Sequence, residues 1–217
     1  MKVNGLVTAA GLSSRMGETG FKPLLPFRGK TVIENTVDSM LQAGIEQVVV
    51  VLGHRAEEIE QVLFQTQAYH DGKILTAYNS NAAGTDMLCS IKLGLEIMPE
   101  CDAFFLLPGD MPLIARETFL KLIQVKEETG AKLIFPTIDG HRKHPPLIDS
   151  SVTKVICDYQ GEDGLRGIWN NFEAIDAESM SAVHVAIEDM GCVMDMDTGE
   201  DYKKMKKVSY PDRDSCI

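Results

Sequence analysis

The 217-residue sequence lacks the features that mark secreted and membrane proteins. Its five cysteines are widely spaced and include no CxxC pair, which argues against a disulfide framework or a zinc ribbon and indicates reduced thiols. No stretch reaches the ~18 apolar residues of a membrane span, and the apolar run at the N-terminus is too short for a signal peptide. We therefore expect a soluble, cytoplasmic protein with no membrane partner.

Positive charge is also scarce, because 21 Lys and Arg face 32 Asp and Glu for a formal net charge of -11. Sequence-independent binding to nucleic acid needs clustered Lys and Arg, so we expect a small ligand and no nucleic-acid partner. The sequence contains neither the GxxxxGK[ST] phosphate loop, nor the GxGxxG dinucleotide fingerprint, nor the GxSxG elbow of serine hydrolases. These absences exclude three common classes of nucleotide-binding protein and hydrolase.

What is present predicts a single α/β domain over residues 1–208, followed by a polar ending, 209–217, that is typical of a disordered tail. Period-two and continuous apolar runs predict strands at 6–10, 47–52, 74–78, 103–107, 133–135, 183–187 and 192–194. Helical spacing predicts helices at 32–43, 56–64, 86–98, 117–128, 152–159, 164–172 and 198–207. Their alternation favours a three-layer α/β/α Rossmann-like fold, in which a mainly parallel sheet binds ligands beyond the carboxyl ends of its strands.

The first candidate site is the glycine-bearing segment TAAGLSSRMGETGFK, from Thr8 to Lys22, which follows the first predicted strand. Small residues in such a turn let backbone N–H groups approach a phosphate closely. Between positions 11 and 30 there is one anion, Glu18, against four cations, Arg15, Lys22, Arg28 and Lys30. The segment has the composition of a phosphate cradle, and the alternative is a loop whose cations simply face water.

Carboxylates make up the second and third candidate sites. Asp110 follows the apolar run 104–107 directly, so we expect it at the carboxyl end of a central strand, where Mg²⁺ could bind between one or two carboxylates and substrate phosphates. Asp195 and Asp197 stand in DMDTGEDY at another predicted strand end, where alternation would place them on opposite faces, so that one of them faces the metal. The alternatives are ordinary ones, since Asp often begins turns or caps helices.

Five segments in the same order resemble the MobA-like NTP transferases, and within them the molybdenum cofactor cytidylyltransferases. They are TAAGLSSRMG with the downstream Lys22, PGDMP at 108–112, GHRKHP at 140–145, DGLR at 163–166 and DMDTGEDY at 195–202. The resemblance covers the chain from about residue 3 to 207. It implies a Mg²⁺-dependent nucleotidyltransferase that transfers CMP from CTP to a small phosphorylated acceptor such as molybdopterin and releases pyrophosphate.

The same resemblance assigns roles to individual residues. It implies catalytic roles for Arg15 and Lys22 at the β- and γ-phosphates and for Asp110, and metal ligation by Asp110 and Asp197, with Asp195 as the alternative. Nucleotide contacts would come from Ala9, Ala10, Gly11, Ser13, Arg15, Met16, Gly17, Lys22 and Asn79. The acceptor would be held by Arg142, His144 and Arg166, and contact with a molybdoenzyme is implied as well.

The sequence departs from the family pattern at three places. Four residues separate Gly17 from Lys22 where the family usually has two or three, Gly199 replaces a proline, and the GM-x-S-S core has become Asp86-Met87-Leu88-Cys89-Ser90. Ala10 in place of the second glycine of the guanylyltransferase form favours CTP over GTP. Two other hypotheses stay open at this point: a sugar- or polyol-phosphate nucleotidyltransferase, and a nucleotide-binding module that delivers a cofactor without chemistry of its own.

Overall fold

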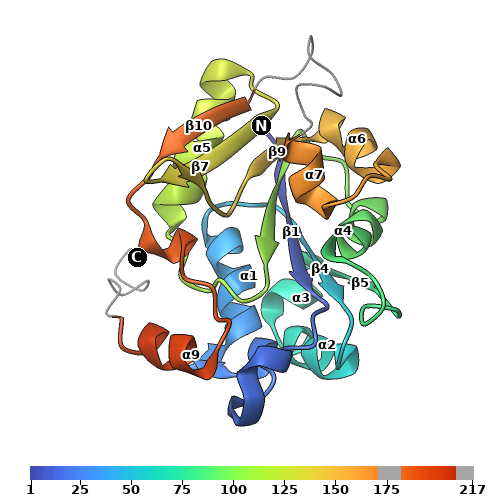
Figure 1. Ribbon diagram of the computed structural model, residues 1–217, viewed down its shortest axis with the longest axis vertical. Helices are drawn as coiled ribbons and strands as arrows, with labels where there is room; N and C mark the ends of the chain where they lie inside the picture. The colour runs from blue at the N-terminus through green and yellow to red at the C-terminus, as the bar shows by residue number, and fades with distance from the viewer. Residues whose placement is uncertain (171–181, 209–217) are drawn as a thin grey trace.

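The computed structural model describes residues 1–170 and 182–208 and shows a central sheet between two layers of helices (Figure 1). The predicted tail and Phe172, the end of one predicted helix, lie outside these residues. The main sheet consists of β1 (Val3–Ala9), β4 (Val48–Leu52), β5 (Ile74–Tyr78), β6 (Ala103–Pro108), β7 (Leu133–Ile138), β8 (His141–Arg142), β9 (Leu147–Asp149) and β10 (Ala182–Ala186). The helices are α1 (Val32–Gln42), α2 (Ala56–Phe64), α3 (Gln67–His70), α4 (Met87–Glu96), α5 (Arg116–Thr129), α6 (Thr153–Asp158), α7 (Gly164–Asn170) and α9 (Gly199–Met205).

Most neighbouring strands of this sheet run parallel, in the spatial order β10-β7-β9-β6-β1-β4-β5. The central strand β1 pairs in parallel with β4 on one side and β6 on the other. Strand β9 lies antiparallel between β6 and β7, and the short β8 pairs with the end of β7. The predicted three-layer α/β/α fold with a mainly parallel sheet is therefore confirmed. Among the described residues, no helix is both long and apolar enough to cross a membrane.

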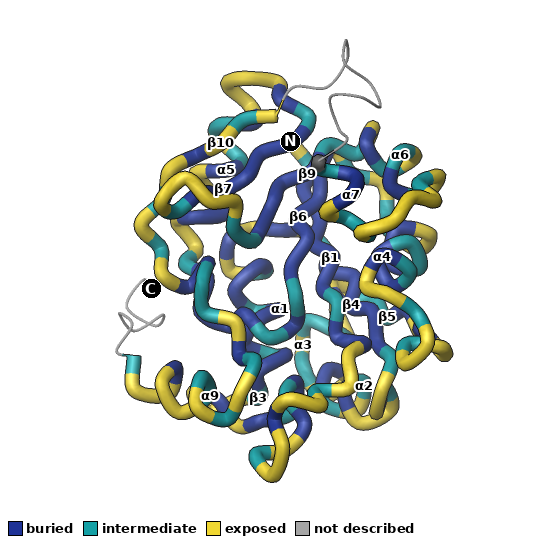
Figure 2. The backbone as a smooth tube through the Cα atoms, in the orientation of Figure 1, coloured by how far each residue is buried: buried dark blue, intermediate teal, exposed yellow. Residues whose placement is uncertain are grey.

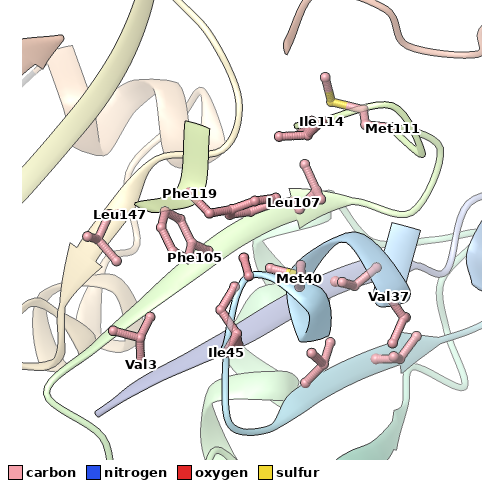
Figure 3. Close-up of a cluster of buried hydrophobic side chains, with 14 of the residues drawn as sticks. Val3, Val37, Met40, Ile45, Phe105, Leu107, Met111, Ile114, Phe119 and Leu147 are labelled. Carbon is pink, nitrogen blue, oxygen red and sulfur yellow. The ribbon is translucent and has the colours of Figure 1, made fainter. Parts of the chain in front are cut away.

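Side chains that alternate along the strands divide the core into two faces. Val7 of β1 belongs to the cluster covered by α1, α2 and α5, whereas the adjacent Leu6 belongs to the cluster covered by α4, α6 and α7. The four valines of β4 are fully buried, as expected for a strand covered on both sides. Figure 2 shows these strands as the buried centre of the molecule, and Figure 3 shows part of the first cluster.

Local signals placed two of these helices correctly. Thr31 and Glu34 form a reciprocal capping box at the start of α1, and Asp86, the first residue of the predicted helix 86–98, accepts a hydrogen bond from the Cys89 N–H at the start of α4. A third helix, α9, begins with a capping box between Thr198 and Asp201. These caps hold the helices that border the carboxyl edge of the sheet.

The predicted strand at 192–194 is wrong. Residues Met190–Cys192 form a 3-10 turn instead, which Asp189 caps by accepting a hydrogen bond from the Gly191 N–H at 2.9 Å. A Cβ at Gly191 would stand 2.1 Å from the Leu113 carbonyl oxygen, so this turn packs against backbone. Cys192 is buried in this turn and Val193 and Met194 are half-buried, a pattern that a short hydrophobic run does not distinguish from a strand.

Residues 138–146, where the sequence predicts neither a helix nor a strand, also contain regular structure. Asp139 and Gly140 both have positive φ, and they connect β7 to β8 as a tight hairpin. Asp-Gly between potential strands is a strong hairpin signal, so this element could have been found in the sequence. The hairpin matters because it brings residues 142–144 to the same edge of the sheet as the end of β6.

A partly buried ion pair joins α5 to β9 at the opposite edge. The Lys126 ammonium, whose side chain is 7% exposed, donates to Asp149 Oδ2 at 2.5 Å and to the Ala131 carbonyl at 3.1 Å. Burial alone would raise the pKa of Asp149, but Lys126 and Ser151 outweigh burial and lower that pKa below its ordinary value. The ionised carboxylate therefore contributes stability that is present above the pKa of Asp149 in the unfolded chain.

Asp149→Asn should lower the free energy of unfolding at pH 7 by about 1.5–3 kcal/mol, the usual range for a hydrogen bond to a charged group. The amide keeps the acceptor for Ser151, so the change isolates the lost charge. Because a depressed carboxyl pKa stabilises above the unfolded pKa, the difference from wild type should shrink as the pH falls below ~4. Urea unfolding at a series of pH values checks this, and a difference that grows on acidification would contradict it.

Candidate active site

A cavity of about 630 Å³ opens at the carboxyl edge of the sheet, above the ends of β1 and β6. Three parts of the chain border it: the segment from Thr8 to Arg15 with Lys22, the start of α4 with the residues before it, and the edge formed by Pro108–Met111, Arg142–His144 and the 192–197 segment. Crevices at this edge are where α/β sheets bind their ligands. The structure thus brings most of the sequence-predicted site residues to one cavity.

The segment after β1 lies close to the neighbouring loop. A Cβ at Gly53, just after β4, would stand 2.7 Å from the Ala10 carbonyl oxygen, so only glycine allows this approach. Ala9, Ala10, Gly11 and Ser13 line the cavity. Ser13 also holds the segment together, because its Oγ accepts a hydrogen bond from the Lys22 N–H at 3.3 Å.

Met16 and Gly17, two predicted nucleotide contacts, do not line the cavity. The Met16 side chain is buried in a third apolar cluster, which joins this segment to the C-terminal part of the described chain. The cluster consists of Met16, Leu25, Phe27, Val32, Leu113, Met196 and Met205. Gly17 has φ 52° and ψ -132°, a combination that glycine tolerates best. Both residues therefore shape and anchor the segment in this structure.

Four charged groups from distant parts of the sequence meet at the cavity floor. The Lys22 ammonium donates to Asp110 Oδ2 at 2.7 Å and to Asp197 Oδ1 at 3.0 Å. Arg15 Nη1 donates to the other oxygen of Asp197 at 2.5 Å. The longer spacing before Lys22 does not prevent its reach, because the 3-10 turn Ser14–Thr19 takes up two of the four intervening residues and a second 3-10 turn begins at Lys22 itself.

The other two cations of the predicted cluster lie elsewhere. Arg28 donates to the Val208 carbonyl at 2.8 Å, and Lys30 forms an ion pair with Asp38 at the surface of α1. Neither residue lines the cavity. The local positive charge that the sequence indicated is therefore focused on Arg15 and Lys22, which face the carboxylates.

Asp110 and Lys22 are mostly buried, with side chains that are 15% and 13% exposed. Burial disfavours the ammonium form of Lys22, but Asp110 and Asp197 outweigh burial and raise the pKa of Lys22 above its ordinary value. Lys22 is therefore a fixed positive charge at neutral pH. Asp110 follows the end of β6, as predicted, whereas Asp197 follows a turn instead of a strand.

Asp195 lies in the same cavity as Asp197, so their predicted placement on opposite faces is wrong. The residues between 193 and 198 do not form a strand, and strict alternation does not apply to them. Burial, followed by the charges of Asp197 and Asp110, raises the pKa of Asp195 above its ordinary value. Three carboxylates therefore share one region with two cations.

The donor set fits a divalent cation that is shared with a substrate. Asp110 Oδ1 is buried and has no hydrogen-bond partner, so half of this carboxylate is available for a ligand. No group of three or more His, Cys, Asp or Glu side chains in the described ranges is arranged to hold a metal by protein ligands alone. Mg²⁺ commonly binds one or two carboxylates together with substrate phosphates, which matches Asp110 with Asp197.

The opposite wall carries the basic residues of the β7–β8 hairpin. Arg142 lies over the Phe135 ring, 4.8 Å from its centre, and its Nε donates to His184 Nε2 at 3.2 Å. His144 lines the cavity as well, and burial lowers its pKa below the ordinary value even though Asp110 and Asp195 oppose this shift. The ring is therefore neutral at neutral pH, while Arg142 supplies a positive charge held in place by two side chains.

Two further predicted contacts, besides Met16 and Gly17, stand outside the cavity lining. Arg166, on α7, is exposed, and Asn79 is buried. The Asn79 amide donates to Thr85 Oγ1 at 3.0 Å and to Ser90 Oγ at 2.9 Å, and both of those residues line the cavity. Asn79 therefore lies behind the cavity wall and holds Thr85 and Ser90 of that wall in place.

Sequence reasoning missed several lining residues, namely Thr85, Asp86, Met87, Ser90, Cys192 and Val193, as cavity contacts. Asp86, Met87 and Ser90 fall in the segment that departs from the family's GM-x-S-S core, and Thr85 precedes it directly, so this departure was the signal that could have found them. For Cys192 there was none, because its neighbours were assigned to a strand. Burial, followed by the charge of Asp189, raises the pKa of the Cys192 thiol far above its ordinary value, so it stays protonated.

Comparison with known proteins identifies the family. The sequence model of one protein family, the MobA-like NTP transferase domain, matches residues 5–177. The chain therefore belongs to the MobA-like NTP transferase family. The bifunctional protein GlmU of Thermoanaerobacter pseudethanolicus is 31% identical over 159 residues, which are 71% of this MobA-like NTP transferase and 33% of that relative. The chain thus spans about a third of the length of that relative.

Solved structures with the same fold are more distant in sequence. Rv0371c from Mycobacterium tuberculosis H37Rv aligns with a TM-score of 0.73 and 24% identity, over 96% of this MobA-like NTP transferase and 100% of that chain. The same mycobacterial protein has been solved as a complex with manganese. The 4-diphosphocytidyl-2C-methyl-D-erythritol synthase from Anaerococcus prevotii aligns with a TM-score of 0.69 and 18% identity, over 94% and 96% of the two chains. These likenesses establish the fold, and a special closeness to molybdenum cofactor cytidylyltransferases stays a prediction.

Proposed function

We propose that this protein transfers a nucleoside monophosphate, CMP from CTP, to a small phosphorylated acceptor and releases pyrophosphate in a Mg²⁺-dependent reaction. The main support is that Arg15, Lys22, Asp110 and Asp197 meet in one cavity at the carboxyl edge of the sheet, within the family's domain. Carboxylates for a divalent cation and cations for a triphosphate are the two requirements of Mg²⁺–NTP binding.

The proposed reaction is an in-line displacement. A phosphate oxygen of the acceptor forms a bond to the α-phosphorus of the nucleotide, while the bond from that phosphorus to the oxygen bridging to the β-phosphate breaks. The electron pair of the broken bond leaves with pyrophosphate. No protein nucleophile takes part, and the protonated thiol of Cys192 agrees with this. Catalysis then depends on positioning and on charge complementary to the transition state.

Each charged residue has a distinct role in this proposal. Asp110 and Asp197 hold Mg²⁺, which supplies positive charge to the phosphate oxygens when it is bound. Lys22 and Arg15 bind the β- and γ-phosphates and neutralise the leaving pyrophosphate. The backbone of the 9–13 segment lies close to the phosphates because its small residues leave room for them.

The acceptor side is assigned to the wall of the β7–β8 hairpin. Arg142 is a suitable anion-binding group, since Phe135 and His184 restrict its guanidinium at the cavity. His144 lies beside it as a neutral hydrogen-bonding group. Molybdopterin is the proposed acceptor, and contact with a molybdoenzyme belongs to that assignment.

The preference for CTP is supported by Ala10 and by one structural neighbour whose name denotes a diphosphocytidyl product. The altered 86–90 segment lines the cavity, so base and acceptor selection both depend on residues that differ from the family pattern. The experiment below therefore compares all four nucleotides.

Pyrophosphate release should be measured with each of the four NTPs and Mg²⁺ across a panel of molybdopterin, sugar phosphates and polyol phosphates. We expect turnover with CTP and molybdopterin, and a clear fall when Arg142→Ala is used at limiting acceptor. Turnover with a sugar or polyol phosphate alone would keep the nucleotidyltransferase and replace the acceptor. Silence with every pair would reject the proposed activity.

A further inference from the structure

The groups assigned to the triphosphate and the groups assigned to the metal are bound to each other in this structure. Lys22 donates to both Asp110 and Asp197, and Arg15 donates to the remaining oxygen of Asp197. Lys22 stands between the two carboxylates with its side chain 13% exposed. A ligand that binds only the two carboxylates, or only the two cations, must therefore break the ion pairs between them.

A divalent cation that arrives alone meets a cost. To reach both carboxylates it must displace the Lys22 ammonium, which would then stay in a mostly buried place without an anionic partner. Leaving one buried charge unpaired is much less favourable than keeping the pair.

A triphosphate that arrives alone meets the opposite cost. If it draws Lys22 and Arg15 to its own oxygens, Asp110 and Asp197 lose their counter-ions while Asp195 lies in the same cavity. Like charges held close together disfavour this state. When the cation and the triphosphate arrive together, every charge exchanges one opposite partner for another and none is left alone.

We propose that Lys22 is an exchangeable counter-ion that makes the divalent cation and the triphosphate bind to this site as a pair. This inference rests on the proposed function, because it assumes that the cavity takes a metal and a nucleotide. The proposal predicts that each ligand raises the binding affinity of the other. The factor must be the same whichever ligand is added first.

The local structure lets the side chain exchange partners while the backbone stays in place. The Lys22 N–H is bonded to Ser13 Oγ, and the next residue, Pro23, is buried. The four-carbon side chain of lysine can therefore move its ammonium between the carboxylates and a nearby phosphate by rotation about its own bonds. Arg15 is far more exposed, and within the described ranges it pairs with Asp197 and not with Asp110, so it is less able to block a metal.

The test uses Mn²⁺ as the probe, with binding measured by calorimetry or electron paramagnetic resonance in the absence of nucleotide. Lys22→Met, which keeps the length and removes the charge, should bind Mn²⁺ about 10-fold or more tightly than wild type, within the usual range of site-to-site coupling. Arg15→Met should bring a smaller gain, and Lys154→Met, an exposed lysine on α6 outside the cavity, should bring none.

The second measurement adds a CTP analogue with a non-hydrolysable α,β-methylene bridge. Wild type should bind Mn²⁺ at least 10-fold more tightly with the analogue than without it, and this factor should be smaller in Lys22→Met. Equal Mn²⁺ affinity of wild type and Lys22→Met without nucleotide, or equal gains from Lys22→Met and Arg15→Met, would overturn the inference.

The outcome is distinguishable from failure of the proposed function. If the inference alone is wrong, wild type still releases pyrophosphate and binds the analogue. If Lys22→Met does not fold, as judged by its thermal transition, Lys22→Gln replaces it. The wild-type protein by itself also tests the coupling. If Mn²⁺ and the analogue bind to it independently of each other, the coupling is overturned.

Discussion

Asp110→Asn should lower the rate of nucleotidyl transfer by about 1,000-fold, the upper range for removing one group that stabilises charge in a transition state. The substitution keeps the size of the side chain, removes the charge proposed to hold the metal, and leaves Lys22 with one anionic partner instead of two. Pyrophosphate release under saturating CTP, Mg²⁺ and acceptor is the measurement.

The matched control is Asp158→Asn, the same chemical change on the exposed end of α6 and outside the cavity, which should leave the rate unchanged. Thermal unfolding of both variants separates a catalytic loss from a folding defect. This prediction also distinguishes the enzyme from a cofactor-delivery module, because a module without chemistry would keep its biological activity in Asp110→Asn. A variant that turns over at the wild-type rate would remove Asp110 from the mechanism.

Phe105→Ala should lower the free energy of unfolding by about 3–5 kcal/mol, as expected for truncating a buried aromatic side chain in a packed core. Phe105 lies on β6, is fully buried and meets Phe119 of α5 edge to face, with ring centres 5.0 Å apart (Figure 3). Urea unfolding followed by circular dichroism measures the effect.

Leu120→Ala, at an exposed position on the same helix as Phe119, is the control and should cost far less than the core substitution. Because Asp110 follows β6, the loss of Phe105 should also loosen the floor of the cavity. A fall in stability of under about 1 kcal/mol would mean that the strand is not packed as the structure indicates.

Elements with strong local signals were predictable from the sequence. The valines of β4 and the apolar run of β6 have few alternatives to a buried strand, because β-branched and aromatic side chains fit a covered sheet. The capping box of α1 and the cap at Asp86 depend only on residues within one turn. The alternation of predicted strands and helices along the chain also predicted the fold class.

Elements that depend on distant partners were not predictable in the same way. The strand β9 pairs antiparallel between β6 and β7, and nothing within its three residues specifies those neighbours. The turn at 190–192 depends on Asp189 and on close contact with the Leu113 backbone. A short apolar run has the same appearance in both settings, so its environment sets its structure.

The candidate site also has a part that the sequence predicted and a part that only the structure showed. Residue types and their order were enough to nominate Arg15, Lys22, Asp110 and Asp197, because phosphate and Mg²⁺ chemistry calls for cations and carboxylates at the ends of strands. Only the folded chain places Lys22 between two carboxylates that stand 88 and 175 positions away, and only it brings Asp195 into the same cavity. The physical reason is that side-chain chemistry is local, whereas the meeting of charges is set by sheet order and by the third apolar cluster, which joins Met16 to Met196 and Met205.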